Sequence, residues 1–360
     1  MPVPSVRPRL APEALDSVFD RLRDRVAAGD IPAAALAIGD SDGAIRSETF
    51  AAGSRDRIDP QSYFFLASLT KPIVATAAMQ LVEAGSLDLH APIARHLPQF
   101  ATAPKDLVTL WHLLTHTSGV YDVPIDTIRR ERPSAARMTQ LTLDAPLNFQ
   151  PGTRWEYCSS SFYLIGLLIE KASGLGYPDY LRQRLFEPLG MQATFDPRGS
   201  GRQLVRVHGV GADNRLVRFL LLRYLASIAV PGGGLWGTLD DLLRFGAASM
   251  RPRPTDGGYV PLSPATAALM MEDQIGGVVG DVDGETKPVY FGLGWGKPTL
   301  MREAPGSPRV VSHGGATGTR LWIDPDSELV FVFFTNQWDP NREPEVEALA
   351  GTYRALAGQG

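Results

Sequence analysis

Strand-like segments lie near the two ends of this 360-residue chain, and a long, mainly helical region separates them. At the N-terminal end, the runs 31–38 and 44–51 flank the turn sequence Asp-Ser-Asp-Gly, which predicts a β-hairpin. At the C-terminal end, residues 309–312, 319–323 and 329–335 are strand-like. The simplest arrangement places all of these strands in one sheet covered by helices.

Helical periodicity dominates the remaining sequence. Apolar residues recur at helical spacing in residues 12–29. Further helices are predicted in the segments 68–85, 108–115, 159–172, 177–186 and 345–356. We therefore expect an α/β (α+β) fold, with an antiparallel sheet flanked by helices and a large, mainly helical inserted lobe. The chain 1–360 is expected to form one domain, with lobes at approximately 1–89 plus 236–360 and 90–235.

The composition excludes several classes of protein. The formal net charge is −4 and no basic stripe stands out, so nucleic acid is not an expected partner. Cys158 is the one cysteine, so no intrachain disulfide can form. Residues 1–8 contain no apolar core of signal-peptide length, and we therefore expect a cytoplasmic protein.

The most apolar later segment, residues 219–230, does not change this expectation. Arg223 interrupts the run, Arg218 precedes it, and the run is too short to span a bilayer. We interpret it as a buried or lid-like helix and expect no membrane contact. The oligomeric state stays open.

Three short motifs carry chemistry, and the first is Ser68-Leu69-Thr70-Lys71. Residues three apart lie on one face of a helix, so the Ser68 hydroxyl and the Lys71 amine can meet there. A serine hydroxyl becomes a good nucleophile when a base takes its proton, and a buried, neutral lysine amine is such a base. Taken alone, the motif is more often an N-cap serine followed by a solvated lysine.

The second motif is Tyr157-Cys158-Ser159, at the start of a predicted helix. Tyr157 can shuttle a proton, and Ser159 can hydrogen-bond Lys71. A packed tyrosine and an N-cap serine explain the same residues without any chemistry, so this motif is also ambiguous alone.

The third motif is His313-Gly314-Gly315, at the end of the predicted strand 309–312. Two residues without side chains let a substrate lie against the strand. The next backbone N–H, that of Ala316, can join the N–H of Ser68 in an oxyanion hole. A simple turn at a strand end is the ordinary alternative.

In combination, the three motifs resemble the serine β-lactamase and penicillin-binding-protein superfamily, most closely its class C-like branch. That branch also holds DD-peptidases, D-aminopeptidases and family VIII carboxylesterases. The resemblance covers almost the whole chain and implies a β-lactamase/transpeptidase-like fold. Besides the pair Ser68 and Lys71, it rests on residues 113–119 (LLTHTSG), 151–157 (PGTRWEY), 232–236 (GGGLW), 290–296 (YFGLGWG) and 313–315 (HGG).

The chain departs from the family pattern in three respects, one of which is that the usual Tyr-Ser-Asn-x-Gly-Tyr run is eroded at residues 157–162 (YCSSSF). Tyr157-Cys158-Ser159 stands where the family usually has Tyr-x-Asn, and serine is a shorter, weaker partner for Lys71. His313-Gly314-Gly315 stands where β-lactamases usually have Lys-Thr-Gly, which removes a permanent cation that would attract the carboxylate of a β-lactam. Arg302 or Arg320 could replace that charge. The departures favour esterases and D-aminopeptidases over dedicated β-lactamases.

The resemblance implies a serine hydrolase that forms a covalent acyl-enzyme on Ser68, with Lys71 and Tyr157 moving protons. The leading expectation is a carboxylesterase acting on small-molecule esters. The alternatives are a D-aminopeptidase or DD-peptidase acting on amides, a weak β-lactamase, and a non-catalytic penicilloyl-binding module. No metal or organic cofactor is expected. The residues expected to bind substrate or its oxyanion are Ser159, His313, Gly314, Gly315, Ala316 and Trp236.

Other conspicuous residues have simpler explanations. His112 and His116 are four apart, as zinc ligands can be, but no Glu follows His112, and a structural role near a turn is favoured. Cys158 is expected to be a small buried thiol. Three tryptophans either line an apolar acyl pocket or belong to the core: Trp155, Trp236 and Trp295.

Overall fold

The structure is a computed structural model that describes residues 10–53, 57–209, 215–254, 259–282, 284–301 and 304–358. Its strands are β1 (Ala33–Asp40), β2 (Gly43–Ala51), β3 (Phe64–Phe65), β4 (Trp236–Gly237), β5 (Val278–Val282), β6 (Glu285–Val289), β7 (Val311–Gly315), β8 (Thr319–Asp324) and β9 (Leu329–Thr335). Its α-helices are α1 (Asp16–Ala28), α2 (Thr70–Glu83), α3 (Leu110–Leu114), α4 (Ile125–Glu131), α5 (Ala135–Asp144), α6 (Ser161–Ser173), α7 (Tyr177–Leu181), α8 (Glu187–Leu189), α9 (Arg215–Ile228), α10 (Leu239–Met250), α11 (Pro264–Met271) and α12 (Glu343–Ala357). Short 3₁₀ turns cover Pro12–Leu15, Ala67–Leu69, Ile93–Arg95, Pro98–Phe100 and Lys105–Leu107, and Arg182–Phe186 is a π-helical turn.

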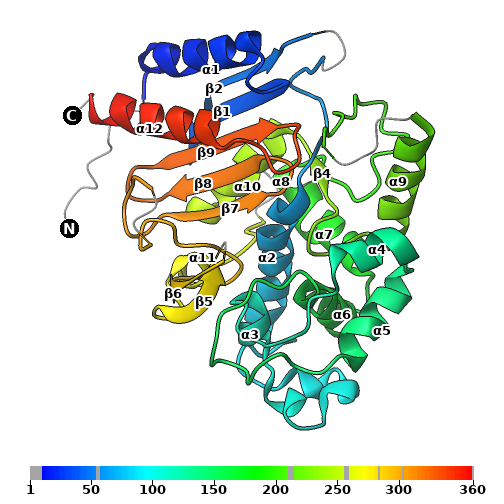
Figure 1. The fold of residues 1–360 in the computed structure, drawn as a ribbon. Coiled ribbons are helices and arrows are strands. Elements are labelled where there is room, and N and C mark those ends of the chain that lie inside the picture. The colour runs from blue at the N-terminus through cyan, green and yellow to red at the C-terminus, as the bar shows by residue number, and fades with distance from the viewer. Residues whose placement is uncertain are drawn as a thin grey trace, which may run out of the picture.

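One five-stranded antiparallel sheet joins the two ends of the chain, in the order β2-β1-β9-β8-β7 (Figure 1). β1 forms the predicted hairpin with β2 and pairs with β9 on its other side, so Leu36 lies between Glu48 and Phe333. This is the expected α/β (α+β) fold with an antiparallel sheet. The strand order leaves β7 at an edge of the sheet, where its last residues can be approached from the side.

The two faces of the sheet support two hydrophobic cores. On one face, Phe331 packs in a cluster with Phe19 of α1 and Leu349 of α12. On the other face, Val332 belongs to a larger cluster that includes residues of α2, α6 and α10. Every residue of β9 is buried, because helices cover both faces of the sheet at this strand. Central strands of this kind are rich in apolar residues on both sides.

α2 runs through the middle of the molecule, from the sheet into the helical part (Figure 1). Its residues from Thr70 to Leu81 are all buried. A short ladder pairs Phe65 of β3 with Trp236 of β4, which ties the chain before Ser68 to the chain that follows α9. The start of α2 is therefore anchored to the sheet side and to the helical side at once.

The elements agree with the predicted segments, with two corrections. The strand predicted at 309–312 is β7 (Val311–Gly315), so His313-Gly314-Gly315 lie within the strand and not in a turn at its end. α9 covers most of the apolar run 219–230, but this helix is not buried, since Phe219 is 54% exposed and Leu220 is 43% exposed. The lobe boundaries at residues 90 and 235 stay a prediction. Within the described ranges, no helix combines the length and the apolar character needed to cross a bilayer.

Candidate active site

Ser68 lies in the 3₁₀ turn Ala67–Leu69, which leads directly into α2. Ser68 is partly exposed, whereas Ala67 and Leu69 are buried. Ala67 has a φ of +46°, a left-handed conformation that costs a non-glycine residue about 1 kcal/mol or more. The Oγ1 of Thr70 donates to the Ala67 carbonyl at 2.7 Å and accepts the Leu235 N–H at 3.1 Å, which holds the turn in place. The Ser68 hydroxyl is thus presented at the N-terminal end of α2.

Lys71 is fully buried one turn further along, and its amine has three polar partners. Its Nζ lies 3.1 Å from Oγ of Ser68, 3.2 Å from Oγ of Ser159 and 2.7 Å from the carbonyl oxygen of Gly232. All three partners are neutral oxygens rather than carboxylates. In its neutral form, an amine in this position is placed to accept the Ser68 proton.

Gly232 is a site residue that the motif GGGLW signals but that the sequence analysis did not assign. A Cβ at this position would lie 2.9 Å from the Ser159 carbonyl oxygen and 3.5 Å from Nζ of Lys71. The absence of a side chain therefore lets the backbone approach Lys71 closely enough to accept its hydrogen bond.

Ser159 is positioned by Asp122, a second residue that the sequence analysis did not find. The carboxylate of Asp122 accepts the N–H of Ser159 at 3.1 Å, and the N–H and Oγ of Ser160 at 2.8 Å each. These bonds satisfy backbone donors just before α6, where a carboxylate is also favoured by the helix dipole. Asp122 follows the LLTHTSG motif by three residues, so only its closeness to that motif could have signalled it.

The Tyr157 ring lies between Lys71 and His116. Its centroid is 4.8 Å from Nζ of Lys71 and 4.5 Å from the His116 ring, which is tilted by 31° against it. The Nδ1 of His116 accepts the Cys158 N–H at 3.1 Å, so the neutral ring carries its proton on Nε2. Burial, with Lys71 and His313 nearby, holds the pKa of His116 well below its ordinary value. His116 therefore acts as an uncharged support for Tyr157, in agreement with the structural role favoured for it.

His313 on β7 is buried and lies near Tyr157. The centroids of the two rings are 6.2 Å apart. Burial is the main cause that lowers the pKa of His313 to about 3. The ring is consequently neutral near pH 7 and supplies no cation. Arg320, one of the two suggested replacements, instead bonds to Glu345 of α12 at 2.7 Å. The other, Arg302, lies outside the described residues.

The second of the two glycines after His313 is required by packing within the protein. A Cβ on Gly315 would lie 2.3 Å from the Leu66 carbonyl oxygen, so β7 approaches the turn before Ser68 very closely. A Cβ on Gly314 would lie 3.1 Å from the Arg320 guanidinium. Ala316, the next residue, is exposed at the end of β7. A role of the Ser68 and Ala316 N–H groups as an oxyanion hole stays a prediction.

The surroundings of the remaining candidate residues indicate structural roles. His112 caps α3 through its contacts with Thr109. Burial raises the pKa of the Cys158 thiol to about 12, so this thiol is unreactive, as expected of a small buried side chain. Within the described ranges, no three His, Cys, Asp or Glu side chains gather as metal ligands. The three tryptophans are buried: Trp236 against Phe65, Trp295 against Phe245, and Trp155 beside Phe291.

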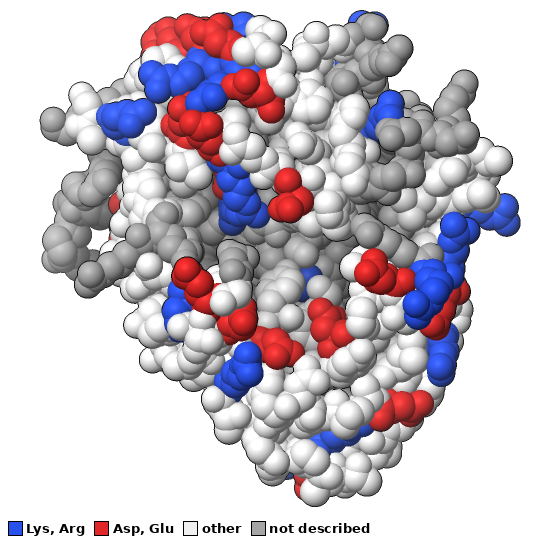
Figure 2. Space-filling model, in the orientation of Figure 1, with Lys and Arg blue, Asp and Glu red and all other residues white. Residues whose placement is uncertain are grey.

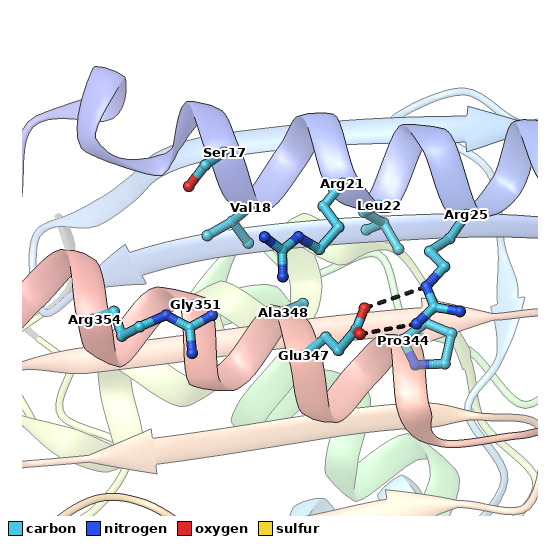
Figure 3. A pocket seen from close by; sticks show the side chains of 10 residues that line it. All are labelled: Ser17, Val18, Arg21, Leu22, Arg25, Pro344, Glu347, Ala348, Gly351 and Arg354. Atoms are coloured by element: carbon cyan, nitrogen blue, oxygen red, sulfur yellow. Dashed lines mark hydrogen bonds and ion pairs between the residues drawn. The ribbon is translucent and has the colours of Figure 1, made fainter.

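The face of the molecule in Figure 2 is hollowed near its middle, between the sheet and the helical part. A separate groove lies between α1 and α12 and is lined in part by Arg21, Arg25, Glu347 and Arg354 (Figure 3). Arg25 spans this groove with two hydrogen bonds to Glu347, of 3.2 and 2.8 Å. Since α1 and α12 cover the sheet face opposite α2, this groove is remote from Ser68.

The Ser68 site combines the parts needed for acyl transfer: a partly exposed hydroxyl, a buried amine beside it and an aromatic hydroxyl residue next to the amine. The site is made of residues from four separate segments, at the start of α2, before α6, after α9 and at the end of β7. The fold brings together Ser68, Lys71, Tyr157, Ser159 and His313, which the sequence analysis selected from positions far apart in the chain.

A family model described as Beta-lactamase matches residues 18–355. "Esterase EstB" of Burkholderia gladioli is 32% identical over 372 aligned positions, which cover 89% of each chain. "Penicillin-binding protein 4" of Amycolatopsis lactamdurans is 31% identical over 334 positions, or 88% of this chain and 83% of that protein.

Solved structures share the fold at lower sequence identity. EstCE1, described as a hydrolase with promiscuous acyltransferase activity, superimposes with a TM-score of 0.75 at 21% identity, covering 95% of this chain and 99% of that one. A family VIII carboxylesterase gives a TM-score of 0.79 at 17% identity, covering 96% and 98% of the two chains.

Proposed function

The chain belongs to the beta-lactamase family and is a serine hydrolase, and we propose that within this family it is a carboxylesterase that cleaves small acyl esters through a covalent intermediate on Ser68. We choose an ester as the substrate because His313, beside the Ser68–Lys71 pair, is buried and neutral. A substrate carboxylate would find no cation in this residue, whereas a neutral ester requires none.

The proposed reaction has two steps. Neutral Lys71 takes the proton from Oγ of Ser68 as that oxygen attacks the ester carbonyl carbon, and the carbonyl electrons move to the oxygen. The N–H groups of Ser68 and Ala316 donate to this oxyanion. When the intermediate collapses, the C–O bond to the alcohol breaks, and the alcohol oxygen receives a proton through Tyr157. The product of this step is an ester of Ser68.

Water completes the cycle in the second step. Tyr157 and Lys71 together take a proton from a water molecule, whose oxygen attacks the acyl-enzyme carbonyl carbon. Collapse returns the electrons and a proton to Oγ of Ser68 and releases the carboxylic acid. The contacts among Ser68, Lys71 and Ser159 support this scheme, because they place the amine within hydrogen-bond distance of the nucleophile.

A second candidate is hydrolysis of D-amino-acid amides or peptides, or weak β-lactam hydrolysis. It is favoured by the 31% identity to a protein named Penicillin-binding protein 4. A third, a module that is acylated without turnover, is disfavoured by the presence of Tyr157, whose ring lies beside Lys71.

One substrate panel separates these candidates. A single preparation is assayed with short-chain nitrophenyl esters, a chromogenic cephalosporin and D-alanyl amides, and kcat/KM is compared. The proposal predicts that the esters are cleaved much faster than either other class at neutral pH. If the cephalosporin is hydrolysed as efficiently as the best ester, the β-lactamase candidate replaces the esterase.

A further inference from the structure

α9 presents apolar side chains to solvent in its first half. Val217, Phe219, Leu220 and Leu221 are 43%, 54%, 43% and 37% exposed. Large apolar residues gathered on one exposed helix are unusual for a protein surface and mark a site of interaction. From the sequence we expected a buried or lid-like helix without membrane contact, and the exposure of these side chains shows that the burial expectation is wrong.

The surroundings of α9 are basic. The hydroxyl of Tyr224 on α9 donates to the Pro133 carbonyl at 3.0 Å, which fixes the helix beside the connection between α4 and α5. Arg130, Arg132 and Arg137 are exposed around this connection, and Arg223 is exposed on α9 itself. Of these, Arg130 pairs with the neighbouring carboxylate of Glu131 at 3.3 Å. Figure 2 shows Lys and Arg side chains at the right-hand edge, with some Asp and Glu side chains among them.

The charge of this region opposes that of the whole protein. Residues 125–137 and 215–228 together contain seven arginines against two acids, Asp126 and Glu131, in a chain whose formal net charge is −4. The remainder of the chain is therefore strongly acidic. A local cluster of arginines beside exposed Leu, Val and Phe is the composition of helices that lie in the interface of an anionic bilayer.

We propose that the α9 surface, defined as the exposed residues Val217, Phe219, Leu220, Leu221, Arg130, Arg132, Arg137 and Arg223, binds peripherally to an anionic lipid bilayer. The apolar side chains enter the boundary between head groups and acyl chains, and the guanidinium groups contact lipid phosphates. A second copy of the chain is the other possible occupant, but two copies would bring two clusters of arginines together, which like-charge repulsion disfavours.

The α9 surface is also connected to the Ser68 site. The segment directly after α9 contains Gly232, whose carbonyl oxygen accepts a hydrogen bond from Lys71. Membrane binding through α9 would hold the site close to the bilayer, where esters of low water solubility accumulate. The inference about binding does not depend on the proposed esterase activity, because binding is measured without substrate.

The test is sedimentation of the full chain with vesicles. Vesicles of phosphatidylcholine mixed with phosphatidylglycerol are compared with vesicles of phosphatidylcholine alone. We expect binding to the mixed vesicles, at least about tenfold weaker binding to the neutral ones, and release at high ionic strength. Equal binding to both kinds of vesicle, or binding to neither, would overturn the proposal.

Two variants and their controls locate the binding surface. Phe219→Ser/Leu220→Ser and Arg130→Gln/Arg137→Gln should each weaken binding to mixed vesicles by about tenfold. Leu107→Ser/Val346→Ser and Arg198→Gln/Arg244→Gln change residues that are equally exposed elsewhere and should leave binding unchanged. Turnover of a soluble ester should stay the same in all four, so that loss of binding is separated from loss of the Ser68 site.

Light scattering tests whether a second copy of the chain, rather than a bilayer, covers the α9 surface. If the native protein forms a dimer, fails to bind vesicles, and becomes a monomer in Phe219→Ser/Leu220→Ser, the occupant of α9 is another protomer and the membrane proposal is wrong. Should that variant fail to fold, the comparison of vesicle types and ionic strength with the native protein still decides the question.

Discussion

The amine of Lys71 lies 3.1 Å from the hydroxyl of Ser68, and its other two hydrogen-bond partners are the hydroxyl of Ser159 and the carbonyl of Gly232. The amine is therefore buried without a carboxylate in hydrogen-bond contact. These contacts hold the amine within hydrogen-bond distance of the Ser68 hydroxyl, where a proton can pass between the two groups.

Lys71 and Tyr157 form one proton-transfer unit in the proposed reaction, so the effects of losing each should not add. Lys71→Ala and Tyr157→Phe should each lower kcat by about 100-fold or more, which is typical of general acid–base catalysis. The double variant should lose little beyond the worse single variant. Steady-state kinetics of the four proteins check this. A double variant that loses the full product of the two effects would show that the residues act independently.

Asp122 is expected to act as a positioning residue. Asp122→Ala removes the acceptor of three hydrogen bonds from Ser159 and Ser160, which frees Ser159 to move away from Lys71. We expect kcat to fall by about 10- to 100-fold with a much smaller change in KM, since the loss is one of alignment. Asp122→Asn, which keeps one acceptor oxygen, should recover part of the loss.

The control for this prediction is Asp144→Ala, which changes an exposed carboxylate on α5. It should leave both constants unchanged. If Asp122→Ala retains native kcat while it is folded, or if KM rises with kcat unchanged, then Asp122 contributes to substrate binding or to stability only.

The neutral state of His313 should determine the preference among substrates. Because burial lowers its pKa to about 3, the ring carries no charge at any pH used for an assay, and lowering the pH to about 6 should not improve turnover of a cephalosporin relative to an ester. His313→Lys introduces a cation and should shift the ratio of kcat/KM values toward the cephalosporin by about tenfold. His313→Gln, which stays neutral, is the matched control. A ratio that is the same in folded His313→Lys and in His313→Gln would refute the charge argument.

The buried histidines should also make stability depend on pH. The folded pKa values of His116 and His313 lie below the ordinary value of about 6.5, so the unfolded chain binds more protons than the folded one. Stability is therefore complete above pH 6.5 and is lost as the pH falls toward the folded values. Each histidine contributes a slope of about 1.4 kcal/mol per pH unit in that window.

Denaturant unfolding at several values between about pH 7.5 and pH 5 measures this slope. His313→Gln removes one of the contributing groups and should flatten the dependence, whatever its effect on stability at a single pH. A variant with the native slope would mean that His313 is protonated to the same degree in the folded and unfolded states.

Much of the fold could be predicted from the sequence, because it is encoded in local periodicity. The hairpin of β1 and β2 follows from two apolar runs around a turn, and the last three strands from similar patterns. The exposure of α9 could not be predicted, because an apolar helix has the same sequence pattern whether or not another part of the protein covers it.

Part of the site could also be predicted from the sequence, because some of its residues stand in local patterns. Ser68, Lys71, Tyr157 and His313 stand in short motifs whose spacing carries information. Asp122 and Gly232 contribute through hydrogen bonds across the fold, to Ser159 and to Lys71, and no local pattern encodes such distant partners. The need for a glycine at position 315 was also not evident from the sequence. It arises because the carbonyl oxygen of Leu66, which is far away in the sequence, approaches this residue closely.

The most direct test of the account is the identity of the nucleophile. The native protein and Ser68→Ala are treated with a serine-reactive phosphonate, the adduct is located by mass spectrometry of peptides, and ester turnover is measured on the same samples. We expect one adduct per chain, on Ser68, and neither an adduct nor ester turnover in Ser68→Ala. An adduct on another residue, or undiminished turnover by Ser68→Ala, would contradict it.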